Sequence, residues 1–352
     1  MATKKQVLKT FIDLVSIDSP SGEEDKVAKY IIRYLKKIGV NASCDKYGNV
    51  IARLKGYGEP LLLCAHMDTV EPGKGIKTFV KNDIIKSTGE TILGADDKGA
   101  ITEILEALRE IKTRSLKHRP LEIVFTKEEE TDFSGSLNLD YKKLEAKNAL
   151  VLDYSLPPGT IVQKAPFIYI FDIKIKGKAA HSGSFPEKGI NAIKVAADAI
   201  AELKLGRINN STVINIGTIK GGLIRNGVPA EVNIKGEVRS IRQESAQKQI
   251  DLVSKAFKKS VRKYKAKLLL KIKQDCYGYS HLRSNSLIKE IVIVNKDLKI
   301  KTSFIQAGGV SDANVFNKKG INSVVISKGG SNPHSPKESI KISHMQTMIK
   351  FL

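Results

Sequence analysis

The stretch LLLCAHMDTV, residues 61–70, is an apolar run that leads into a histidine and an aspartate. Such a run predicts a buried strand with polar side chains at its carboxyl end. Further short apolar runs occupy residues 49–54, 121–126 and 149–153, and a helical pattern covers 99–111. Buried strands that alternate with amphipathic helices predict an α/β fold class with a largely parallel sheet. The crevice of such a sheet opens at the carboxyl ends of its strands.

The chain before this core predicts an amphipathic helix. The stretch SGEE, residues 21–24, has the form of an N-terminal capping box. Apolar residues follow at helical spacing between Val27 and Ile38, and Gly39 is suited to end the helix.

From about residue 166 the pattern changes to that of a small α+β domain. Strands and helices follow in the order β-α-β-β-α-β, which is the ferredoxin-like split βαβ unit. The predicted elements are a strand at 167–176, a helix at 190–203, strands at 212–220 and 231–239, a helix at 244–264 and a strand at 267–276. A unit of this length can fold as a domain of its own.

After residue 279 the α/β pattern returns. It comprises a helix near Ser286, strands at 302–306 and 323–327, and a terminal helix from Ser343. We therefore expect one α/β domain in two pieces, interrupted by an insertion. The expected segments are the first α/β part at 1–165, the inserted α+β domain at 166–279 and the second α/β part at 280–352.

Composition and charge exclude several classes of protein. The chain has 352 residues, of which 41% are hydrophobic and 27% charged, so wholesale disorder is excluded. Its net charge is +22, but 48 scattered lysines outnumber 11 arginines and there is no tryptophan. Base and phosphate recognition relies on arginine forks and aromatic side chains. The excess charge, including a basic cluster at 255–273, thus favours a solvated lysine-rich surface over nucleic-acid binding.

The sequence also indicates a cellular compartment. No apolar run approaches the roughly 20 residues of a membrane span, and the N-terminal stretch MATKKQVLKT lacks the apolar core of a signal peptide. Cys44, Cys64 and Cys276 have no spacing typical of a disulfide framework or a zinc ribbon. These features predict a cytoplasmic protein with no membrane partner.

Side chains that bind cations recur at the ends of the predicted strands and at a helix start. They are His66 with Asp68, the pair Asp96 and Asp97, the run Glu128–Glu130, Asp153, and His334. Each alone has a plainer interpretation as a loop histidine, a helix cap or an exposed acidic loop. Together, at one sheet edge, they predict a centre for two adjacent divalent cations that activate water. The imidazoles favour zinc over magnesium and leave manganese and cobalt open.

At this point the sequence resembles a known family, the co-catalytic zinc hydrolases of the aminoacylase/carboxypeptidase type, and most closely its peptidase-T-like branch. The matching motifs follow the family order: HMDTV at 66–70, GADDKG at 94–99, FTKEEE at 125–130, LVLD at 150–153, AHSG at 180–183, PEKGINA at 186–192, GGVSDAN at 308–314 and His334. The resemblance implies a zinc-exopeptidase-like α/β catalytic domain with an inserted lid or dimerisation domain.

The resemblance also implies which residues bind the metal ions. Asp96 would bridge two ions. His66 and Asp153 would complete one site, and Glu130 and His334 would complete the other. The implied cofactors are two divalent ions per subunit, zinc first, with manganese or cobalt as alternatives.

Three more residues of the α/β domain receive roles from the resemblance. Asp68 is the carboxylate behind His66, which alternation along the strand places on the same side. Glu129 is the general base. Asp97 is not a ligand but lies beside an unusual peptide bond that aims the bridging ligand. A shift by one along the glutamates would make Glu128 the base and Glu129 the metal ligand. The later register is preferred because Thr126 then aligns as it does in the peptidase-T-like branch.

The inserted domain has polar candidates of its own. His181 lies at the turn after its first strand, where a lone histidine is usually a surface residue. The resemblance implies that His181 binds the scissile carbonyl oxygen and that Asn226 and Arg239 hold the substrate carboxylate or backbone. An arginine fork suits a carboxylate. In dimeric relatives the small domain forms the dimer and its histidine serves the partner's site, so a homodimer through this domain is expected.

These inferences lead to one predicted function and two alternatives. The prediction is a dinuclear-metal-dependent amide hydrolase, an exopeptidase of tripeptidase or aminopeptidase type that acts on short peptides. The first alternative is an N-acyl-amino-acid deacylase with the same metal ions. The second, from another class, is a basic nucleic-acid-binding protein on a vestigial hydrolase fold. Every inferred ligand and the base are present, which argues against a vestigial centre.

Overall fold

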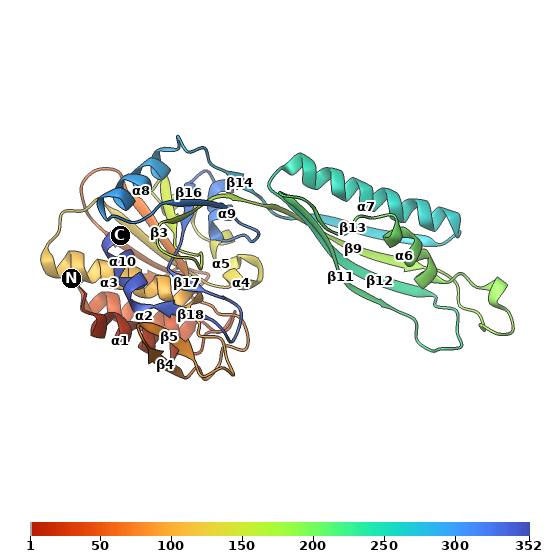
Figure 1. Ribbon diagram of the computed structural model, residues 1–352, viewed down its shortest axis with the longest axis horizontal. Coiled ribbons are helices and arrows are strands. Elements are labelled where there is room, and N and C mark those ends of the chain that lie inside the picture. Colours follow the sequence, from red (N-terminus) through yellow and green to blue (C-terminus); the bar gives the residue numbers. More distant parts are fainter. Residues whose placement is uncertain (1) are drawn as a thin grey trace. The chain divides into compact units, whose positions relative to one another are not determined.

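The computed structural model describes residues 2–352 and divides the chain into two compact units (Figure 1). Unit 1 comprises the residues up to 163 together with 281–307 and 311–352. Unit 2 comprises 164–280 together with 308–310. An α+β unit is thus inserted into an α/β unit that is built from both ends of the chain.

The large sheet of unit 1 has the strand order β1-β2-β6-β3-β7-β16-β8-β14, with β15 paired to β8. Its strands are β1 (Ala42–Cys44), β2 (Val50–Leu54), β3 (Leu61–His66), β6 (Leu121–Thr126), β7 (Asn148–Val151), β8 (Thr160–Ala165), β14 (Tyr279–Ser280), β15 (Ser303–Gln306) and β16 (Asn322–Ile326). The central strands β6, β3, β7 and β16 run parallel, whereas β2 and β8 join them antiparallel. The expected largely parallel sheet is therefore right for the centre and wrong for the edges, because a short apolar run carries no information on strand direction.

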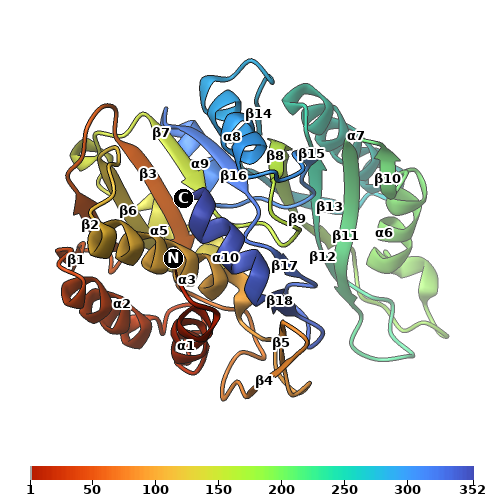
Figure 2. The ribbon, with the colours of Figure 1, turned by 60° about the vertical axis from the view of Figure 1, so that its left-hand side comes forward.

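Four helices pack on this sheet through one apolar cluster, to which Leu63 and Ala65 of β3 contribute. They are α2 (Asp25–Lys37), α3 (Ala95–Arg114), α8 (Ser286–Asp297) and α10 (Ile342–Phe351). Helix α1 (Lys4–Val15) packs on α3 and α10, and the three lie together in Figure 2. Since side chains alternate along a strand, His66 points away from this cluster.

Short elements complete the α/β unit. They are α4 (Glu129–Asp132), α5 (Ser134–Leu137), the 3-10 turn at Tyr141–Lys143 and α9 (Asp312–Lys318), which contacts β7 and β16. A separate antiparallel sheet has the order β17-β18-β5-β4, with β17 at Gly330–Ser331, β18 at Ser339–Lys341, β5 at Ile84–Ser87 and β4 at Thr78–Lys81. Pairing of β18 with β5 joins the last loop of the chain to the segment before α3.

The sequence analysis did not predict the small sheet or helix α1, and only the small sheet lacked a readable pattern. The small sheet consists of strands of two to four residues, too short to show a period. Helix α1 did have a readable pattern, because the Thr3 side chain caps it and Val7, Phe11 and Leu14 are buried at helical spacing.

The predicted helix after residue 24 is present, but its expected cap is wrong. Helix α2 begins at Asp25, and Glu24 stands at the cap position without a side-chain bond to the helix. The Ser21 hydroxyl instead donates to Oδ2 of Asp68 at 2.6 Å. Gly39 follows the helix with a φ of 73°, a left-handed conformation that glycine adopts readily.

Unit 2 is an antiparallel sheet covered by two helices. The strand order is β10-β11-β12-β9-β13, with β9 (Phe167–Lys176), β10 (Gly206–Asn209), β11 (Thr212–Gly221), β12 (Glu231–Ser240) and β13 (Lys267–Cys276). Helices α6 (Ala192–Ala201) and α7 (Gln243–Lys263) contact each other and the sheet around buried Phe171 and Phe257. A 3-10 turn lies at Pro186–Lys188. The β-α-β-β-α-β order is present, and β10 is an added strand that is too short and polar to predict.

The helices and cysteines show two simpler features. Among residues 2–352, no helix combines the length and the apolarity that crossing a bilayer requires. No disulfide joins the three cysteines, of which Cys44 is exposed while Cys64 and Cys276 are buried.

Candidate metal centre

The structure brings the predicted cation ligands of unit 1 together from several elements. They are His66 at the end of β3, Asp96 at the start of α3, Glu130 in α4 after β6, Asp153 after β7, and His334 in the loop after β17. Because β3, β6 and β7 are parallel neighbours, their carboxyl ends meet at one edge of the sheet.

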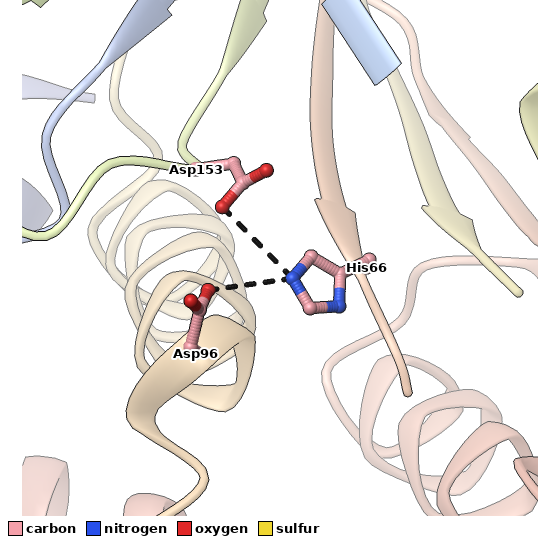
Figure 3. Close-up of side chains that lie close together, drawn as sticks. All are labelled: His66, Asp96 and Asp153. Atoms are coloured by element: carbon pink, nitrogen blue, oxygen red, sulfur yellow. Dashed lines mark hydrogen bonds and ion pairs between the residues drawn. The ribbon is translucent and has the colours of Figure 1, made fainter. Parts of the chain in front are cut away.

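The first group of donors surrounds the buried imidazole of His66. Its Nε2 lies 3.4 Å from Oδ1 of Asp96 and 3.9 Å from Oδ1 of Asp153 (Figure 3). In Figure 3 both carboxylates point toward this nitrogen. The three ligand atoms lie within 4.8 Å of one another. One imidazole and two carboxylates in this arrangement can bind one divalent ion.

Asp96 faces a second histidine with its other oxygen. Nε2 of His334 lies 3.4 Å from Oδ2 of Asp96 and 2.9 Å from Oε1 of Glu130. Hydrogen bonds to Asp96 and Glu130 raise the pKa of His334 to about 10. The two oxygens of Asp96 thus belong to two different donor groups, which is what a bridging carboxylate requires.

Asp68 holds His66 from behind. Its backbone carbonyl oxygen lies 2.9 Å and its Oδ1 3.4 Å from Nδ1 of His66, and its two carboxylate oxygens accept from the backbone N–H groups of Glu129 and Glu130 at 3.0 and 3.1 Å. Burial opposes ionisation of Asp68, but the hydrogen bond and charge of His66 and the bond from Ser21 lower its pKa below the ordinary value. Asp68 therefore orients the ring so that Nε2 faces the donor group.

The three consecutive glutamates point in different directions. Glu129, which is 5% exposed, and Glu130 form a group with His66 whose ligand atoms lie within 4.8 Å. Burial and neighbouring carboxylates raise the pKa of Glu129 well above its ordinary value. Glu128 has a positive φ of 51°, and its Oε2 accepts from the Tyr47 hydroxyl. This geometry favours Glu129 and Glu130 over the register shifted to Glu128.

Two further buried charges adjoin the first donor group. Asp97 follows a cis peptide bond and accepts from the backbone N–H of His66 at 3.2 Å. Nζ of Lys328 contacts Oδ1 of Asp96 and lies 3.2 Å from Oδ1 of Asp97 and 3.3 Å from Oδ1 of Asp153. Burial would lower the pKa of Lys328, but the three carboxylates raise it well above the ordinary value. Sequence analysis missed Lys328, although a lysine two residues after a buried strand was a usable signal.

Glu338 is a positioning residue that sequence analysis also missed. Its Oε2 accepts from the backbone N–H groups of Leu93 and Gly94, and its Oε1 accepts from that of Asp96, each at 2.8 Å. The residue is 1% exposed. Glu338 therefore fixes the backbone from which Asp96 projects, and no spacing rule in the sequence pointed to it.

We expect Glu338→Ala to lower the free energy of unfolding by about 3 kcal/mol, because three buried N–H groups would each lose an acceptor worth about 1 kcal/mol or more. Urea unfolding followed by circular dichroism measures this change. Glu59→Ala, at an exposed position, is the control and should leave the midpoint unchanged. Equal midpoints for both variants would show that Glu338 does not hold this loop.

His181 and Asn226 lie side by side in unit 2. Nδ1 of the exposed His181 accepts from the backbone N–H groups of Gly183 and Ser184 at 3.2 and 3.1 Å. In the neutral ring the proton is therefore on Nε2, which can donate. The carbonyl of Asn226, in the loop between β11 and β12, accepts from the N–H of Ser182 at 3.1 Å and holds the histidine turn.

Arg239 lies near the end of β12 and has an occupied fork. Its Nε and Nη2 donate to the two carboxylate oxygens of Glu237 at 2.9 and 3.1 Å. Its Nη1 donates to the carbonyl of Gly308 at 3.2 Å. The guanidinium expected to bind a substrate carboxylate is thus held by Glu237, with which a substrate would have to compete.

The donor set fits divalent ions. Imidazole nitrogens and carboxylate oxygens form three overlapping groups among residues 2–352, and such mixed donors suit zinc, manganese or cobalt. The carboxylates buried here, among them Asp96, Asp97 and Glu129, need positive charge nearby, and Lys328 supplies one positive charge. An α/β unit with these donors at the carboxyl ends of its strands, together with a buried glutamate, defines the class of metal-dependent hydrolases.

Comparison with known proteins identifies the family. Residues 170–265 match the model described as a peptidase dimerisation domain, and residues 49–156 match that of peptidase family M28. The protein YqjE of Bacillus subtilis (strain 168) is 33% identical over 98% of this chain and 96% of its own length. Two crystal structures are 31% identical: aminopeptidase PepT from Bacillus cereus (TM-score 0.93, covering 99% of this chain and 96% of its own) and a tripeptidase from Staphylococcus aureus (TM-score 0.96, 100% and 97%).

The chain belongs to the M20 metallopeptidases, in their peptidase-T-like branch. The resemblance inferred from the motifs, the fold class and the assignment as a metallopeptidase are thereby confirmed.

Proposed function

We propose that this chain is an exopeptidase that uses two divalent ions, most simply zinc, to release terminal residues from short peptides. The observation that carries the proposal is the placement of Asp96, which presents one oxygen to His66 and the other to His334 beside the buried Glu129. The aminopeptidase and tripeptidase activities named for two structures that are 31% identical support the substrate class.

The ligands would divide into two sets that share Asp96. His66 and Asp153 would complete one ion position, and Glu130 and His334 would complete the other. When bound, such ions lower the pKa of water toward neutrality and offset the charge of an oxyanion.

The remaining residues would do the proton chemistry and bind the substrate. Glu129 would accept the proton of the attacking water and return it to the leaving amine. His181 would donate from Nε2 to the scissile carbonyl oxygen as negative charge develops there. Asn226 and Arg239 would hold the substrate backbone or carboxylate, with Arg239 exchanging part of its pairing with Glu237.

Assembly and compartment belong to the same proposal. The match of residues 170–265 to a peptidase dimerisation domain supports a homodimer formed through unit 2. A cytoplasmic location is part of the same proposal. Sedimentation of the purified chain tests the dimer, and a single species at the monomer mass of 38.7 kDa would contradict it.

Chelation is expected to abolish turnover, and added Zn²⁺, Mn²⁺ or Co²⁺ is expected to restore it, because deprotonation of water near neutral pH needs a bound cation. The assay uses a panel of di- and tripeptides beside N-acyl amino acids, which separates an exopeptidase from a deacylase. A gel shift with nucleic acid at several salt concentrations tests the alternative of a nucleic-acid-binding protein, because phosphate binding weakens steeply with salt. Full activity in protein shown by elemental analysis to be metal-free would overturn the mechanism.

A further inference from the structure

Lys328 contacts the same oxygen atoms that the first ion position would use. Its Nζ bonds to Oδ1 of Asp96 and lies 3.3 Å from Oδ1 of Asp153. These are the two oxygens that face Nε2 of His66 in Figure 3. Two of the three donors of this group are therefore already paired with an ammonium.

The second position differs in this respect. Its donors are Oδ2 of Asp96, Oε1 of Glu130 and Nε2 of His334, and the contacts of Lys328 lie on the other oxygen of Asp96. His334 is exposed, whereas Lys328 is 0% exposed and its ammonium contacts Asp96, Asp97 and Asp153. The position at His334 is thus open to an ion without displacement of a lysine.

We propose that Lys328 makes the two ion positions unequal, so that the position at His334 binds an ion tightly and the position at His66 binds one weakly. The inference rests on the proposed two-ion function and refines it. A divalent ion held by Asp96 and Asp153 would have to share their Oδ1 atoms with a positive charge that cannot turn to solvent, and repulsion between buried like charges is strong. Activity would then follow the filling of the weak position.

The same contacts give Lys328 a role in the metal-free protein. Asp96, Asp97 and Asp153 are buried together, and without a cation their mutual repulsion would destabilise the fold. Lys328 supplies that cation in the absence of metal. Removing the charge of Lys328 should therefore lower the stability of the metal-free protein and raise the affinity of the position at His66 for an ion.

The experiment measures ion binding by equilibrium dialysis and elemental analysis, with Zn²⁺ or Mn²⁺ as the probe. The wild-type chain should bind one ion tightly and a second at least ~10-fold more weakly. Lys328→Met should strengthen the weak position by at least ~10-fold and leave the tight one unchanged. Lys328→Arg, which keeps the charge, should preserve the inequality. Lys98→Met is the matched control, because Lys98 is equally buried but donates to the carbonyl of Ile17.

Thermal unfolding supplies a second readout that needs no activity. Metal-free Lys328→Met should melt at a lower temperature than the metal-free wild type. Added metal should raise its melting temperature by more than it raises that of the wild type. Asp153→Asn should remove only the weak ion, whereas His334→Ala should remove the tight one. These two variants assign each affinity to its position even if Lys328→Met folds poorly.

Each outcome has a separate meaning for the two proposals. If the wild type binds two ions with equal affinity and Lys328→Met changes neither, the inference about Lys328 is wrong while the two-ion function stands. If no divalent ion binds either position, the proposed metal-dependent function fails, and the inference fails with it.

Discussion

Replacing Glu129 by glutamine is expected to lower turnover by about 10²–10⁴-fold, the usual contribution of a general base. The amide has nearly the shape of the carboxylate but cannot accept the proton of the attacking water. The backbone N–H of Glu129 that donates to Asp68 is retained, so the frame of the centre should persist. The bound metal should therefore stay at the wild-type level, and steady-state kinetics with elemental analysis measures both quantities.

The neighbouring glutamates are matched controls for this variant. Glu130→Gln removes a carboxylate that faces both histidines and should lower metal occupancy. Glu128→Gln changes a side chain paired with Tyr47 and should leave both turnover and metal content close to wild type. If the largest loss of turnover at intact metal content occurs in Glu128→Gln, the assignment of the base to Glu129 is wrong.

Most of the candidate ligands could be predicted from the sequence because they stand where a buried strand or a helix boundary is readable, whereas His334 lies in a loop beyond β17 and was assigned as a ligand through the family resemblance. His66 and Asp153 follow apolar runs that were predicted to be strands, and parallel neighbours bring such ends together. Ser21 was assigned the wrong partner because a capping residue and a hydrogen-bond donor to Asp68 have the same chemistry. Local sequence cannot distinguish a helix cap from a long-range partner 47 residues away.

The residues that escaped prediction act through contacts distant in sequence. Lys328 meets Asp96 across 232 positions, and Glu338 meets the same loop across 242 to 245 positions. The position of Lys328 just after a buried strand was readable, but its partner Asp96 and the partners of Glu338 were not, because these contacts form only when β16 enters the sheet and β18 pairs with β5. The pairing of Arg239 with Glu237 is local and was readable, since alternate residues of a strand share a face.

His181→Ala is expected to reduce kcat by about 10²–10³-fold, the typical loss when one oxyanion donor is removed. His181 belongs to unit 2 and every candidate ligand belongs to unit 1, so metal content and the melting temperature should stay unchanged. Ser184→Ala is the control, because the backbone N–H that fixes Nδ1 of His181 survives that change. Unaltered kcat in His181→Ala would leave this histidine without a part in the reaction.

A mixture of two inactive variants tests which subunit's centre His181 serves. In a homodimer formed through unit 2, His181→Ala subunits retain the base and Glu129→Gln subunits retain the histidine. If the histidine works in trans, exchange of subunits creates heterodimers in which one of the two centres has both groups, and part of the activity returns. Exchange is verified independently by mass or by label. Exchange without recovered activity would show that His181 does not serve the partner, since a histidine acting within its own chain never meets an intact Glu129 in this mixture.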